Sequence, residues 1–79
     1  MLNVKVGDEV LRMLAGTLPM KLKVTGVTAD RIIIAVPGFE SGPMADSWEF
    51  DRETGAEIDD RFDWGPPPKM TGSYIVVPS

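Results

Sequence analysis

The stretch that decides the fold class is residues 20–36, which reads MKLKVTGVTADRIIIAV. In its first half, apolar and polar residues alternate one by one, with Met20, Leu22 and Val24 on the apolar side. A period of two is typical of an antiparallel strand with one buried face. After a polar break at 28–30, the β-branched run Arg31–Val36 predicts a central strand that pairs with the first one as a hairpin. The stretch therefore predicts an all-β fold.

The same alternation returns in residues 46–51, where Trp48 and Phe50 share one face and are expected in the core. The segment Asp51–Gly55 predicts a hairpin turn, because aspartate can accept hydrogen bonds from the turn backbone and glycine can adopt a left-handed conformation. A further strand is expected after this turn. Its inward residues are Ala56, Ile58, Phe62 and Trp64, and its outward residues are Glu57, Asp59, Arg61 and Asp63.

Asp60 interrupts the inward face of that strand, so it marks either a bulge or the point where the strand leaves the sheet. Residues 65–69, which read GPPPK, predict a stiff connector, and residues 73–77 predict a last strand. Residues 9–14 leave two alternatives. Asp8 and Gly16 fit the cap and the stop of a short helix. A strand over Glu9–Leu14 is favoured, because every other element is a strand and so short a helix is marginal.

The length of the chain limits the chemistry that it can perform. Its 79 residues form one domain over 1–79, with a free energy of unfolding of about 4–12 kcal/mol at typical values per residue. The chain has no His and no Cys, which excludes Ser-His and Cys-His nucleophile pairs, the usual zinc sites and disulfides. No run of apolar residues is long enough for a membrane span, and no signal-like segment is present. We expect a cytoplasmic bacterial protein without a cofactor.

Charge is distributed unevenly along the chain, whose formal net charge is -4. Residues 1–37 carry five basic and three acidic side chains, whereas residues 38–79 carry three basic and nine acidic ones. An acidic surface repels phosphate backbones, which disfavours nucleic acid as a partner. Nucleic-acid binding would require one continuous basic face made of Lys21, Lys23 and Arg31.

The carboxylates of residues 57–63 are dense enough to be considered for acid-base chemistry. Strand spacing, however, turns Glu57, Asp59 and Asp63 towards solvent, where carboxylates keep ordinary properties. Residues 51–62 are superficially similar to a calcium loop, but Phe62 stands at the position that requires a bidentate glutamate. We therefore expect neither a catalytic residue nor a metal site.

The pattern Val6-Gly7-Asp8-x-Val10, followed by Gly16, by Pro19-Met20 and by an aromatic strand with Trp48, resembles short uncharacterised bacterial proteins with SH3-like β-barrel folds. The resemblance is closest over the first half of the chain. It implies a small SH3-like barrel of five to six strands and favours the strand alternative for Glu9–Leu14. It implies no activity, since function depends on sites and not on folds.

The Gly-Asp-x-Val opening is also similar to that of type II dihydrofolate reductase, a short SH3-like barrel that builds one pore from four chains. The pore strand of that family carries a Val-Gln-Ile-Tyr motif. This chain contains no Gln, and its nearest segment, Tyr74-Ile75-Val76, has a different order. The resemblance therefore carries no reductase activity over, but it implies that a barrel of this size can work as an oligomer.

The function expected from the sequence is that of a non-catalytic binding or interaction module that self-associates or binds a protein or peptide. Its contact surface is expected in the two longest connections, where apolar and proline residues gather: Phe39, Met44, Trp64, Pro66, Pro67, Pro68 and Lys69. One alternative is a small-molecule binder, or an enzyme, whose site forms between subunits. The other is a nucleic-acid-binding barrel.

Overall fold

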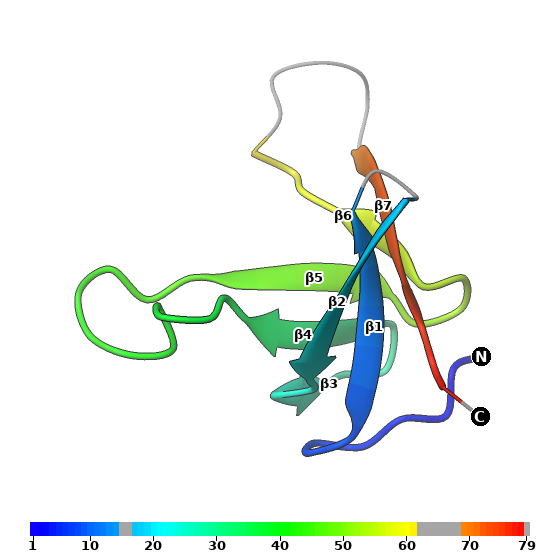
Figure 1. Ribbon diagram of the computed structural model, residues 1–79, viewed down its shortest axis with the longest axis horizontal. Coiled ribbons are helices and arrows are strands. Elements are labelled where there is room, and N and C mark those ends of the chain that lie inside the picture. Colours follow the sequence, from blue (N-terminus) through cyan, green and yellow to red (C-terminus); the bar gives the residue numbers. More distant parts are fainter. Residues whose placement is uncertain (15–16, 62–68, 79) are drawn as a thin grey trace.

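Seven β-strands form one antiparallel sheet in the computed structural model of the chain, which describes residues 1–14, 17–61 and 69–78 (Figure 1). The strands follow the order β2-β1-β7-β6-β5-β4-β3 across the sheet. Their bounds are β1 Glu9–Leu14, β2 Leu18–Lys23, β3 Gly26–Val27, β4 Arg31–Ala35, β5 Ser47–Asp51, β6 Ala56–Ile58 and β7 Met70–Val76. The described residues contain no helix, so the fold is all-β and the strand alternative for Glu9–Leu14 is confirmed.

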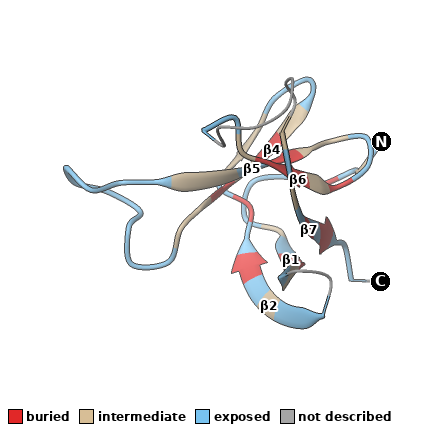
Figure 2. Cartoon of the chain, turned by 90° about the horizontal axis from the view of Figure 1, so that it is seen from above, coloured by how far each residue is buried: buried red, intermediate tan, exposed pale blue. Residues whose placement is uncertain are grey.

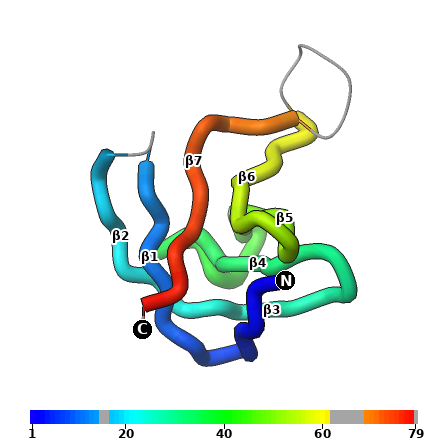
Figure 3. Tube along the Cα trace, turned by 90° about the vertical axis from the view of Figure 1, so that its right-hand side faces the viewer, coloured from blue at the N-terminus to red at the C-terminus, as the bar shows by residue number. Residues whose placement is uncertain are grey.

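The sheet curls strongly into a half-barrel. Strands β2, β1 and β7 lie side by side, and they cross β4 and β5 steeply (Figures 1 and 3). The two edge strands, β2 and β3, follow each other in the chain and are separated only by Val24 and Thr25. The backbone N–H of Val24 donates to the carbonyl of Asp8, and that of Thr25 donates to the carbonyl of Ile33. The hairpin expected between residues 20–25 and the Arg31 strand is therefore made by β3, whereas β2 pairs with β1.

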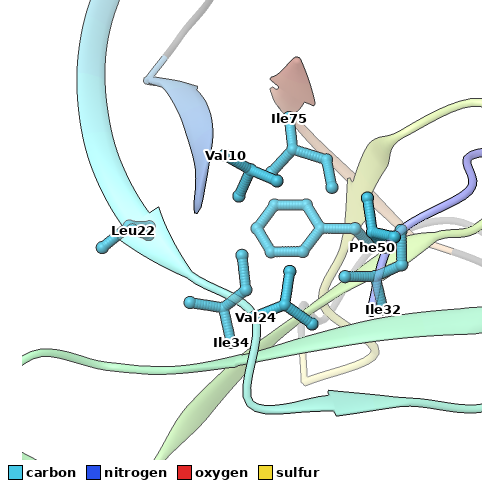
Figure 4. Packing of buried hydrophobic residues seen from close by; sticks show 8 residues of the cluster. Val10, Leu22, Val24, Ile32, Ile34, Phe50 and Ile75 are labelled. Carbon is cyan, nitrogen blue, oxygen red and sulfur yellow. The ribbon is translucent and has the colours of Figure 1, made fainter. Parts of the chain in front are cut away.

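One apolar core fills the inside of the curl, with the ring of Phe50 at its centre (Figure 4). The apolar alternation expected from the sequence accounts for most of this core, because the inward residues of β2, β4 and β5 all pack into it. Figure 2 shows that most of the buried residues lie in the strands, whereas residues 37–46 of the β4–β5 connection are exposed. The core consists of Val4, Val10, Leu22, Val24, Ile32, Ile34, Phe50 and Ile75.

The turn between β5 and β6 has the structure expected for Asp51–Gly55. The Asp51 carboxylate accepts hydrogen bonds from the backbone N–H groups of Glu53 and Thr54, at 2.7 and 3.2 Å. Gly55 adopts a φ of 84°, which favours glycine, and its carbonyl accepts a hydrogen bond from the N–H of Ile75 at 2.9 Å. The turn therefore fixes β6 against β7 as well as against β5.

Changing Gly55 to Ala should destabilise the protein more than the same change at Gly42. Both glycines have positive φ, which costs an alanine about 1–2 kcal/mol. At Gly55 an added Cβ would also lie 2.8 Å from the Ile75 carbonyl oxygen, whereas nothing lies within 4 Å at Gly42. We expect an additional loss of at least about 1 kcal/mol in the free energy of unfolding for Gly55→Ala, measured by urea denaturation. Equal losses for the two variants would contradict this packing.

The strand after the turn differs from the expectation. β6 ends at Ile58, and the pairing of β6 with β7 shifts in register between Ala56 and Ile58. Glu57 was expected to face solvent, but it is buried, because its register partner on β5 is the core residue Phe50. Asp60 was expected to face inward, but it is exposed in the turn that follows β6, as the alternative of a strand end implied. The predicted inward residues Phe62 and Trp64 lie outside the described residues.

Candidate binding cleft

A cleft opens beside the first half of β5, because the chain moves away from this strand at the end of β6. The two strands pair only through Glu49 with Ile58 and Phe50 with Glu57. Beyond Ile58 the N–H of Asp59 donates to the carbonyl of Lys69, so the chain turns away and the start of β5 loses this neighbour. The resulting cavity of about 350 Å³ is here called the Trp48 cleft. Its lining residues are Arg31, Asp46, Ser47, Trp48, Glu49, Glu57, Ile58, Asp59, Asp60 and Arg61.

Arg61 bridges the two sides of the Trp48 cleft. Its guanidinium donates two hydrogen bonds of 2.9 Å to the Asp59 carboxylate and a third, of 3.2 Å, to Asp46, just before β5. Donation by Arg61 lowers the pKa of Asp59, and the two carboxylates raise the pKa of Arg61. Because Arg61 is exposed, the bridge contributes little stability, but it orients the side chains at the rim.

A buried ion pair holds Trp48 in position. Arg12 on β1 donates from Nε to Oε1 of Glu57 on β6 at 2.6 Å, and the two residues are only 6% and 4% exposed. The guanidinium carbon of Arg12 also lies 4.0 Å from the centre of the Trp48 ring. Strands β1, β5 and β6 therefore all contribute to fixing the indole that lines the cleft.

The lining of the Trp48 cleft carries more negative than positive charge. Five carboxylates contribute to it, against the guanidinium groups of Arg31 and Arg61. Arg31 pairs with Glu49 at 3.4 Å, and Arg61 is shared between two carboxylates. Surplus carboxylates beside an indole attract cations through charge-assisted hydrogen bonds, and the face of the ring that Arg12 does not cover adds a cation–π contact. The volume is at the lower end of the range for ligand pockets and has room for a single small group.

Comparisons with protein-family models, with curated proteins and with solved structures find no significant match to this chain. The resemblance to SH3-like bacterial proteins and to type II dihydrofolate reductase therefore rests on the sequence pattern alone. The assignment of a function depends on the geometry of the described residues.

The structure describes three of the contact residues expected from the sequence. Phe39 and Met44 lie in the β4–β5 connection, which projects away from the sheet, and Met44 is 72% exposed (Figure 1). Lys69 is half-buried just before β7, and its N–H donates to the Asp60 carboxylate at 3.4 Å. Trp64, Pro66, Pro67 and Pro68 lie outside the described residues, so that part of the prediction stays untested.

The basic residues considered for nucleic-acid binding lie on two strands. Lys21 and Lys23 are exposed on β2, at one edge of the sheet, whereas Arg31 on β4 pairs with Glu49. Among the described residues, no group of three or more His, Cys, Asp or Glu side chains is arranged to hold a metal ion. The same residues contain no helix that is long and apolar enough to cross a membrane.

The sequence does not predict the buried role of Arg12, and it predicts Trp48 only as a core residue. A signal for Arg12 exists, because it is the only basic residue in the apolar segment Val10–Leu14 and shares strand parity with buried Val10. A buried arginine requires a carboxylate partner. The sequence cannot name that partner, since Glu57 lies 45 positions away.

Proposed function

We propose that this chain is a non-catalytic binding module, and that the Trp48 cleft receives one cationic group, such as a lysine or arginine side chain of a partner protein or peptide. The observation that carries this proposal is the indole of Trp48, fixed by the buried Arg12–Glu57 pair beside a surplus of carboxylates. A fixed ring loses little conformational entropy when a ligand binds, which favours recognition of even a small group.

We also propose that the half-barrel is an SH3-like barrel. Support comes from β2 and β3, which are two pieces of one bent strand and occupy both edges of the sheet. An antiparallel sheet whose edges belong to one continuous segment is close to closure, and closure removes exposed edges. Counted as one strand, the two pieces make six strands in all, within the range that the resemblance implies.

The charges in the cleft favour binding over catalysis. A general acid or base needs a carboxylate whose pKa lies near neutrality, whereas Arg61 moves the pKa of Asp59 in the opposite direction. Glu57 is engaged by Arg12, and Glu49 is engaged by Arg31. These pairs hold the carboxylates in place as a negatively charged surface.

Titration calorimetry with Nα-acetyl-arginine amide tests the proposal, with the citrulline analogue as the uncharged control of nearly the same shape. We expect saturable binding with a Kd on the order of 1 mM, weakened by added salt, because one cationic group makes few contacts. Binding of the citrulline analogue should be at least about tenfold weaker, a difference of about 1.4 kcal/mol.

Two variants locate the site within the same experiment. Glu49→Gln removes a carboxylate from the cleft and should weaken binding several-fold, whereas Glu53→Gln removes an exposed carboxylate outside it and should change nothing. Equal binding of arginine and citrulline probes, or equal effects of the two variants, would count against the cleft.

A further inference from the structure

The outer face of the β1–β7 pair is apolar although the inner face already serves the core. In β1, Val10 and Arg12 point inward and are buried, and the alternate residues Leu11 and Met13 are half-buried on the other face. In β7, Ile75 points inward, whereas Tyr74 and Val76 are 38% and 41% exposed. These two strands therefore carry apolar side chains on both faces.

The outward residues form one continuous surface across three strands. Leu11 is the register partner of Val76, and Met13 is the partner of Tyr74 on one side and of Pro19 on the other. Directly opposed side chains in an antiparallel sheet lie about 4.5–5.5 Å apart and contact each other. We call this surface the outer apolar face, and its residues are Leu11, Met13, Pro19, Tyr74 and Val76.

The strands of a sheet with one solvent-exposed face normally alternate apolar and polar residues. Apolar residues on both faces indicate that a second layer of protein packs on the outer face. Sheets supply such layers for one another by packing face to face, about 10 Å apart. Within the part of the chain that the structure describes, Tyr74 and Val76 stay exposed. We propose that a second copy of this chain covers the outer apolar face and forms a two-fold dimer.

The charges around the outer apolar face favour a second copy as its occupant. Lys21 and Lys23 border it on β2, and Glu9, the register partner of Lys23, borders it on β1. A border with both signs can meet its own copy with opposite charges in contact, whereas a strongly charged partner would meet like charges. In a two-fold contact the same patch serves both partners, so each favourable contact occurs twice.

The size of the outer apolar face sets the strength of the dimer. Together with its charged border, the outer apolar face spans three strands about 4.8 Å apart over about 20 Å, a flat area of roughly 300 Å² per copy. A standard interface buries about 800 Å² per partner. A patch of this size fits a weak dimer. The protein should therefore associate at high concentration and dissociate on dilution.

Sedimentation velocity between about 10 μM and 1 mM tests the dimer, since a weak complex has a Kd in this range. We expect the average mass to rise from 8.6 kDa towards twice that value as concentration increases. The double variant Tyr74→Ser with Val76→Thr, whose fold is checked by circular dichroism, should weaken association at least about tenfold. A strict monomer over the whole range would overturn the proposal.

Met44→Ser is the matched control, because Met44 is more exposed than Tyr74 but lies on the β4–β5 connection. It should leave association unchanged. Loss of the dimer in Met44→Ser, with association unaffected in the Tyr74 and Val76 variant, would move the interface to the loop and would also overturn the proposal. Arginine-probe binding by the double variant should be normal, since its substitutions lie outside the Trp48 cleft.

Discussion

Changing Arg12 to Met should lower the free energy of unfolding by about 3–5 kcal/mol, because it leaves the Glu57 carboxylate buried without its partner. The expected loss is large beside the total of about 4–12 kcal/mol for a chain of this length. Part of it comes from the contact between the guanidinium and the Trp48 ring. Urea denaturation followed by circular dichroism measures the change.

A double-mutant cycle distinguishes the pair from its single members. Glu57→Leu alone should be similarly destabilising, since it leaves the Arg12 charge buried. The double variant Arg12→Met with Glu57→Leu should recover at least about 2 kcal/mol relative to the sum of the single changes, because no buried charge remains. Additive losses would show that the two side chains do not interact, contrary to the geometry at 2.6 Å.

Changing Phe50 to Ala should cost about 3–5 kcal/mol, since the ring fills the centre of the single core and has no exposed surface. Phe50 is contacted from several strands, so its loss leaves a cavity that small movements cannot close. If Phe50→Ala does not fold, Phe50→Leu provides the measurable variant, with a smaller expected loss of about 1–2 kcal/mol.

An exposed apolar residue provides the control for Phe50. Phe39 lies on the β4–β5 connection and is 45% exposed, so Phe39→Ala should change the free energy of unfolding by less than about 0.5–1 kcal/mol. Equal losses for the two phenylalanines would contradict the placement of the core.

Local patterns in the sequence predict the strands because burial on one face imposes a period of two. The alternation at Met20–Val24 and at Trp48–Phe50, and the turn at Asp51–Gly55, all depend on neighbouring residues and are confirmed. The path of β2 into β3 was not predicted, because the sheet that each piece joins is set by contacts far along the chain.

The candidate site shows the same limit. Spacing alone placed Glu57 in solvent, but the pairing of β6 with β5 sets Glu57 opposite the core residue Phe50, and no local pattern reports that pairing. The acidic character of residues 46–61 was visible in the sequence, whereas the cleft depends on Arg61 reaching back to Asp46. The apolar residues of the outer apolar face are visible in the sequence segments Val10–Leu14 and Tyr74–Val77. Only the pairing of β1 with β7 shows that the two segments are adjacent.

The position of a bound cation relative to Trp48 is the measurement that tests the proposed function most directly. Intermolecular nuclear Overhauser effects between the Trp48 ring and the methylene protons of Nα-acetyl-arginine amide report contact between the two. A Trp64→Phe variant assigns the indole signals, because the chain has two Trp residues. We predict contacts to the Trp48 ring together with saturable shifts of the amides of residues 59–61. Saturable shifts elsewhere, with no contact to the Trp48 ring, would contradict the proposed cleft.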